Sequence, residues 1–204
     1  MRFISIGPTC YTAFLLKENG CRTDAYPFDW VFSSLAVVEH CIRDRFADFL
    51  NVSHLHDISG SSARHAVFDP MIDTPNLRAH WIEHGEDPAT QWKFFNHHNL
   101  PDCETHSAFQ RRCERFLEAI QGPGPAQGKE NVTLVYFNRN TDDSAEIISF
   151  AQRVALPHHV HIVALIEKNH GVSNDPPRIT HSSQHLTIFQ ITEANSILRW
   201  LATL

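Results

Sequence analysis

The sequence lacks long apolar runs and blocks of basic residues. No apolar stretch approaches the length that crosses a bilayer, and the apolar segment after Arg2 ends at Gly7 after four residues, so we expect no secretory leader. The formal net charge is −6, and no basic stripe interleaved with aromatics offsets it. These absences predict a cytoplasmic protein with neither a nucleic-acid nor a membrane partner.

The sequence also lacks the common spacings of metal and disulfide sites. Its five cysteines are odd in number and scattered, which fits a reducing compartment better than a disulfide framework. Fifteen histidines are present, but none falls in a Cys-x-x-Cys or His-Glu-x-x-His arrangement. We therefore predict neither a metal site nor another cofactor, and we expect most histidines to lie on the surface and in loops.

What is present is the pattern of an α/β protein. Strands buried on both faces are indicated by short apolar or β-branched runs at residues 3–6, 132–137, 160–166 and 186–191. Helical spacing of apolar residues follows three of them, at residues 11–17, 143–154 and 193–204. Such alternation predicts a single α/β domain over residues 1–204, with a three-layer, Rossmann-like arrangement and a mostly parallel sheet of at least four strands.

The middle of the chain follows a different pattern. Residues 33–50 and 102–121 have the spacing of amphipathic helices. The periodicity is lost over residues 51–100, which are rich in Gly, Ser, Pro, His and isolated aromatics. We interpret this stretch as an irregular insertion or a lid.

Cys10 is the candidate nucleophile. The run at residues 3–6, the Gly7-Pro8-Thr9 break and the helical spacing after it predict strand, turn and helix, with Thr9 as the N-cap. Cys10 then lies in the first helical turn, where free backbone N–H groups and the helix dipole favour the thiolate. The alternative is a small apolar residue that fills the junction between strand and helix.

Other polar residues are expected near Cys10. In an open parallel sheet the ligand crevice lies beyond the carboxyl ends of the strands, and these ends carry residues 7–10, 138–142, 167–170 and 192–193. A thiolate also needs a proton acceptor, for which histidine is the usual choice. Sequence spacing cannot choose among fifteen histidines, but His97 and His98 follow Phe94-Phe95, and two packed aromatics would hold them in place. The alternative is that they merely flank the next helix.

Two clusters of charge remain. Asp29 lies in Tyr26-Pro27-Phe28-Asp29-Trp30, a rigid aromatic turn, where it needs hydrogen-bond partners or a cation such as Arg22. It either caps the helix that begins near Ser33 or orients a catalytic histidine. Arg112 and Arg115 are neighbours on the surface of the 102–121 helix, where pairing with Glu114 or Glu118 is the default and binding of an anionic substrate is secondary.

These motifs resemble, in this order, the domain family described as putative papain-like cysteine peptidases. The matching motifs are Ser5-Ile6-Gly7-x-x-Cys10, Tyr26-Pro27-Phe28-Asp29-Trp30 with Ser33-Ser34, Phe46-x-x-Phe49-Leu50, His97-His98-Asn99 and Arg111-Arg112-x-x-Arg115-Phe116. The resemblance covers residues 3 to about 140. It implies a Cys–His enzyme with Cys10 as the nucleophile and His98, or else His97, as the base, and it implies no known substrate.

The predicted sheet adds a distinction. Papain-like folds pack the cysteine helix against an antiparallel sheet, whereas here the cysteine follows a parallel strand, as the serine of SGNH-type esterases does. We therefore predict a cysteine-dependent hydrolase or acyltransferase that acts on an acyl, peptide or glycan substrate. Cys10 attacks, His98 shuttles the proton, and Asp29 or Asn138 orients the imidazole. Backbone N–H groups of residues 9–11 hold the oxyanion.

The competing class is a binding module without catalysis. It uses the same crevice for a nucleotide-sugar or glycan, with Asn138, Arg139 and Lys168 contacting polar groups of the ligand. In either class, the candidate substrate-binding residues are Gly7, Thr9, Arg22, Asn138, Arg139 and Lys168.

Overall fold

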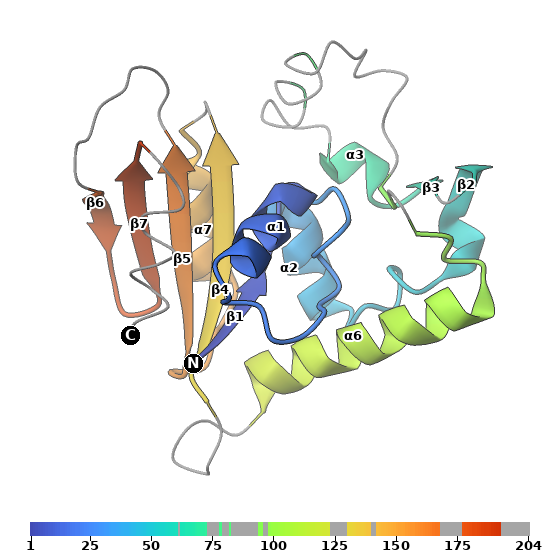
Figure 1. The fold of residues 1–204 in the computed structure, drawn as a ribbon, viewed down its shortest axis with the longest axis horizontal. Helices are drawn as coiled ribbons and strands as arrows, with labels where there is room; N and C mark the ends of the chain where they lie inside the picture. Colours follow the sequence, from blue (N-terminus) through green and yellow to red (C-terminus); the bar gives the residue numbers. More distant parts are fainter. Residues whose placement is uncertain are drawn as a thin grey trace.

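A five-stranded sheet organises the computed structural model (Figure 1), which describes residues 1–60, 62–72, 78, 82, 94–95, 98–122, 130–139, 142–167 and 177–192. The strand order is β1-β4-β5-β7-β6. The strands are β1 (Arg2–Ser5), β4 (Val132–Arg139), β5 (Val160–Glu167), β6 (Arg178–Ser182) and β7 (Leu186–Ile191). Strands β1, β4, β5 and β7 pair in parallel, as predicted, and β6 is an additional edge strand that pairs antiparallel with β7.

Side chains alternate along each strand, so each face of the sheet packs against its own set of helices. In β4, Val135 and Phe137 pack with Leu15 and Leu16 of α1 (Cys10–Glu18) on one face. On the other face, Leu134 and Tyr136 belong to a larger core. That core includes buried residues of α2 (Leu35–Arg43), α6 (Cys103–Gln121) and α7 (Ser144–Arg153).

The helix predicted over residues 33–50 ends earlier than expected. Ser34 caps its start by accepting a hydrogen bond from the backbone N–H of Val37 at 3.2 Å. The helix stops at Arg43 with Asp44 as its C-cap, and the following residues, Arg45 and Phe46, have positive φ angles of 56° and 64°. The Asp44 carboxylate stabilises the turn by accepting from the backbone N–H groups of Phe46 and Asp48. Phe46 and Phe49 are nevertheless buried, as the helical pattern had predicted.

Part of the predicted irregular insertion has regular structure. Residues 51–72 contain the 3₁₀ helix η1 (Val52–His54), the antiparallel hairpin β2 (Leu55–Ser59) and β3 (Ser62–His65), and the short helix α3 (Asp69–Ile72). The hairpin escaped prediction because β2 is mostly exposed and lacks an apolar run. Most of residues 73–97 lie outside the described part of the chain.

Two further helices confirm the sequence pattern. Helix α6 begins after Asp102, whose carboxylate accepts from the backbone N–H of Thr105, and its predicted apolar stripe is buried. Helix α7 matches the segment predicted at residues 143–154, whereas the helix predicted at 193–204 lies outside the described residues. Among the described helices, none combines the length and the apolar character needed to span a membrane.

Candidate active site

The loop between β1 and α1 has the predicted form of strand, turn and helix. Thr9 is the N-cap of α1 and accepts a hydrogen bond from the backbone N–H of Tyr11 at 3.3 Å. Cys10 is therefore the first residue of the helix, and its side chain is half-buried. This placement puts the thiol at the carboxyl edge of the parallel sheet, beside the positive end of the helix dipole.

Gly7 has a steric reason to be glycine. Its φ angle is +97°, and a Cβ atom added there would lie 2.1 Å from the Oγ atom of Ser33. The two segments are held together because the backbone N–H of Ser33 donates to the carbonyl of Pro8 at 2.9 Å. The carbonyl of Gly7 itself accepts from the Thr12 hydroxyl at 2.8 Å. Gly7 thus lets the Ser33 segment approach the turn that presents Cys10.

The electrostatics of the Cys10 thiol differ from the sequence-based expectation. Burial raises the pKa of the thiol, and the backbone N–H of Cys10 itself lowers it by a smaller amount. The net direction is upward, whereas the helix position alone had predicted a lowered pKa. Desolvation disfavours the charged form and outweighs the backbone hydrogen bond, so the environment of Cys10 favours the thiol over the thiolate.

His98 packs among aromatic rings. Its imidazole lies edge-on to the ring of Phe109, with 4.9 Å between ring centroids. Phe95, three residues earlier in the chain, forms an antiparallel bridge with Val31. Within the described residues, no histidine nitrogen hydrogen-bonds to the Cys10 sulfur. His97 lies outside those residues.

Asp29 and Arg22 form the charge pair that the aromatic turn required. The Oδ2 atom of Asp29 accepts from Nε and Nη2 of Arg22 at 3.0 and 2.8 Å, and from the backbone N–H of Tyr26 at 2.8 Å. Burial raises the pKa of the Asp29 carboxyl, although the Tyr26 N–H and Arg22 oppose this. The capping alternative is wrong, because Ser34 caps α2. No described histidine hydrogen-bonds to this carboxylate, so Asp29 holds the turn together.

The arginines of α6 do not pair as expected with glutamates of their own helix. Arg115 donates to the carbonyl of Ala25 at 2.7 Å and lies 3.9 Å from a carboxylate oxygen of Asp24. The guanidinium of Arg112 lies over the ring of Phe109, 4.6 Å from its centroid. Arg115 therefore joins α6 to the segment before the aromatic turn, which helix spacing alone could not predict, whereas Arg112 packs on a ring of its own helix.

Arg139 shares the sheet edge with Cys10. Its Nε donates to Glu167 at 2.6 Å, its Nη2 donates to the hydroxyl of Tyr11 at 3.1 Å, and its guanidinium lies 4.7 Å from the centre of the Tyr11 ring. Burial lowers the pKa of Arg139, but Glu167 more than compensates and the net direction is upward. The structure thus brings the candidate Arg139 to the residue next to Cys10, as the strand-end rule predicted. Tyr11 itself had not been singled out.

Asn138 has a structural role in the same region. Its Nδ2 donates to Asp143 at 2.9 Å, and its Oδ1 accepts from the backbone N–H of Arg139 at 2.8 Å. Asp143 also accepts from the hydroxyl of Tyr136 at 2.5 Å. Asn138 therefore fixes the backbone from which Arg139 projects. Lys168 lies outside the described residues.

Comparison with known proteins gives the family. A stretch of 77 residues is 36% identical to an uncharacterized protein of Acanthamoeba polyphaga mimivirus, and the match covers 36% of this chain and 34% of that protein, so it spans about a third of the relative. No solved structure is significantly similar to the chain. The family described as "Putative papain-like cysteine peptidase (DUF1796)" matches residues 1–172, which include every element from β1 through β5. The chain belongs to this family.

Proposed function

We propose that the protein is a cysteine-dependent hydrolase or acyltransferase in which Cys10 is the nucleophile. The observation that carries the proposal is the position of Cys10 as the first residue of α1, directly beyond β1 and beside Tyr11 and Arg139. The family description supports thiol chemistry and names peptides as the substrate class. Peptide, ester and thioester substrates share the acyl carbon that a thiolate attacks.

We propose that the fold is a three-layer, Rossmann-like arrangement, which the position of α1 on one face of the sheet and of α2 and α7 on the other supports (Figure 1). In sheets of this kind, ligands bind beyond the carboxyl ends of the strands. Cys10 and Arg139 both lie at this edge, since each follows or ends a parallel strand. A substrate carbonyl at Cys10 would have Arg139 at the same sheet edge for its polar groups.

The reaction needs a base as well as a nucleophile. Because burial raises the pKa of the Cys10 thiol, a base must take its proton as the sulfur attacks the acyl carbon. We propose His98 as the base, with His97 as the alternative. Among the predicted oxyanion donors, the Tyr11 N–H already donates to Thr9, so the Cys10 N–H is the proposed donor. The tetrahedral intermediate expels the amine, alcohol or thiol of the substrate, which takes the proton from the base. The acyl-enzyme that remains passes its acyl group to water or to an acceptor, and Cys10 is restored.

A panel of peptide, ester and thioester substrates tests the proposal. We expect Cys10→Ala to reduce kcat by at least about a thousandfold, as loss of a nucleophile does in related chemistry. Cys103→Ala is the matched control, since Cys103 is an exposed cysteine in α6. His98→Asn and His97→Asn separate the two candidate bases. Turnover that survives Cys10→Ala would refute the nucleophile.

The second candidate, a binding module for a nucleotide-sugar or glycan, is favoured by one observation. The raised pKa of Cys10 leaves a neutral thiol, which suits a residue that only packs. In that case Arg139→Ala weakens ligand binding, whereas Cys10→Ala does not. Neither the native protein nor either variant then turns over a substrate of the panel. A glycan-array measurement with both variants distinguishes this class from the enzyme.

A further inference from the structure

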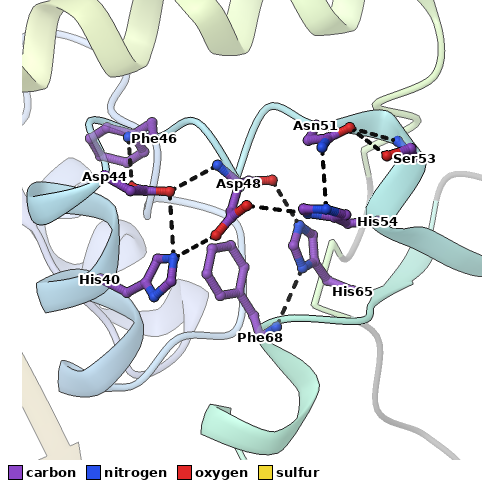
Figure 2. Close-up of polar contacts among 9 residues, drawn as sticks. All are labelled: His40, Asp44, Phe46, Asp48, Asn51, Ser53, His54, His65 and Phe68. Atoms are coloured by element: carbon purple, nitrogen blue, oxygen red, sulfur yellow. Dashed lines mark hydrogen bonds and ion pairs between the residues drawn. The ribbon is translucent and has the colours of Figure 1, made fainter.

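A cluster of histidines and aspartates lies apart from the Cys10 edge, where α2, the turn after it, η1 and β3 meet (Figure 2). The Nε2 atom of His40 lies 2.7 Å from Oδ2 of Asp48 and 3.4 Å from Oδ2 of Asp44. One ligand atom from each of these three residues can be chosen so that all lie within 4.8 Å of one another. Donor atoms around a Zn²⁺-sized ion with bonds of about 2.1 Å are separated by roughly 3.0–3.5 Å, so little movement is needed to surround one.

Among the described residues, no Lys or Arg neutralises the carboxylates of Asp44 and Asp48. Over the described part of the chain, Asp44 and Asp48 form ion pairs with histidines alone, His40 and His54. The arginines on either side of Asp44 are engaged elsewhere: Arg43 pairs with Glu39, and Arg45 donates to Gln121. Two adjacent negative charges without Lys or Arg favour a bound cation.

His54 provides a second, independent observation. Its Nδ1 atom is buried and makes no hydrogen bond, yet it lies 3.5 Å from Oδ1 of Asp48. Asn51 fixes the state of this ring: its Oδ1 accepts from Ser53, so its Nδ2 donates to Nε2 of His54. The proton of neutral His54 is therefore on Nδ1, which lies 3.5 Å from Oδ1 of Asp48 without a hydrogen bond between them. A carboxylate that binds a metal usually accepts a hydrogen bond from a neighbouring donor. His54 offers Asp48 such a donor, but the two form no hydrogen bond in this structure.

The surrounding structure holds the ligands in position. Both oxygens of Asp44 accept backbone N–H groups, and the carbonyl of Asp48 accepts from Nε2 of His65 at 3.1 Å. The ring of Phe68 lies edge-on to His40, with 5.4 Å between centroids. The three candidate ligands are only partly buried, which leaves a path from solvent.

We propose that His40, Asp44 and Asp48 bind a first-row divalent cation of the Zn²⁺ class, with His54 as an outer-shell donor to Asp48. A mixed set of imidazole and carboxylate suits such ions, whereas Ca²⁺ and Mg²⁺ prefer oxygen ligands alone. Binding replaces the proton through which Nε2 of His40 now contacts the carboxylates. With three protein ligands, one position remains for water. The ion would join α2 to the turn at residues 44–51.

Titration of the full-length, chelator-treated protein with Co²⁺ tests the site, because bound Co²⁺ reports its ligands through visible absorption. We expect one saturable equivalent, displaced by Zn²⁺ but not by Ca²⁺ or Mg²⁺, without the charge-transfer absorption that cysteine ligands give. Asp44→Asn and Asp48→Asn preserve side-chain shape and leave all fifteen histidines intact. Each should weaken binding by at least about tenfold.

Asp69→Asn is the matched control. Asp69 also contacts a histidine, His56 at 3.6 Å, but it is paired with Arg64 at 2.8 Å, so its removal should leave the affinity for Co²⁺ unchanged. Far-UV circular dichroism checks the fold of each variant, and His40→Gln replaces any aspartate variant that fails to fold. Absence of saturable binding to the native protein would overturn the proposal. Equal affinity in the aspartate variants, or displacement by Ca²⁺, would do the same.

Discussion

Substitution of Gly7 by alanine should disrupt the turn that presents Cys10, for two separable reasons. The φ angle of +97° costs an L-residue about 1–2 kcal/mol. The added Cβ would also lie 2.1 Å from Oγ of Ser33, and overpacking of this kind costs about 1–3 kcal/mol. We therefore expect Gly7→Ala to reduce the free energy of unfolding by about 2–5 kcal/mol, measured by urea denaturation.

Two further variants separate these contributions. In a Ser33→Ala background the nearest remaining side-chain atom is the Cβ of residue 33 at 3.5 Å, an ordinary contact, so the clash disappears and only the backbone cost remains. Ser33→Ala alone should be nearly neutral, because its buried Oγ makes no hydrogen bond. Gly20→Ala is the matched control, since Gly20 has a φ angle of +68° with no atom within 4 Å of an added Cβ.

The double-mutant cycle should thus show a coupling of about 1–3 kcal/mol between positions 7 and 33. Gly20→Ala should cost only the backbone part, about 1–2 kcal/mol. The reasoning is refuted if Gly7→Ala stays within about 0.5 kcal/mol of the native protein. It is also refuted if Ser33→Ala rescues none of the loss.

Three other predictions concern stability. Burial raises the pKa of Tyr26 to about 12, so the folded state keeps the phenol proton up to a higher pH than the unfolded state does. The free energy of unfolding should therefore fall as the pH rises from about 10 to 12, by about 1.4 kcal/mol at pH ~11, and it should fall less in Tyr26→Phe. Glu39 is buried and pairs with Arg43 and Arg153, so Glu39→Ala should lower the free energy of unfolding by about 2 kcal/mol in urea denaturation. Glu18 is exposed, so Glu18→Ala should change little, and equal effects of the two substitutions would contradict a stabilising role for the Glu39 ion pairs. Phe49 is fully buried among other phenylalanine rings, and Phe49→Ala should cost about 3–5 kcal/mol; a loss below about 1 kcal/mol argues against this packing.

The strands were the most predictable part of the fold. Strands β4, β5 and β7 are covered on both faces, which requires nearly continuous apolar runs that are visible in the sequence. Strand β6 pairs only along one edge and is largely exposed, so it needs no such run and was missed. Burial on two faces, rather than strand propensity alone, made the difference.

The end of α2 shows how a periodic pattern can mislead. Phe46 and Phe49 continue the apolar spacing beyond Arg43, but Asp44 caps the turn and the chain adopts positive φ angles there. Both phenylalanines still reach the core, from the turn rather than from a helix. Local side-chain to backbone hydrogen bonds outcompeted helix propagation.

The candidate site was predictable in position and less so in chemistry. The strand-end rule and the capping signal placed Cys10, Thr9 and Arg139 at one edge. The direction of the Cys10 pKa depends on the burial of its side chain, which the local sequence pattern does not reveal. The spacing of His40, Asp44 and Asp48, four residues apart each time, is visible in the sequence, but it belongs to none of the common cysteine and histidine motifs of metal sites.

The alkylation rate of Cys10, relative to the other cysteines, tests whether this thiol is an activated nucleophile. Iodoacetamide is applied from about pH 6 to pH 9, and mass spectrometry resolves each site, with exposed Cys103 and buried Cys41 as internal references. If a base activates the thiol, half-buried Cys10 reacts faster than Cys103 near neutral pH. If Cys10 reacts more slowly than Cys103 at every pH, burial alone governs the thiol and the claim is contradicted.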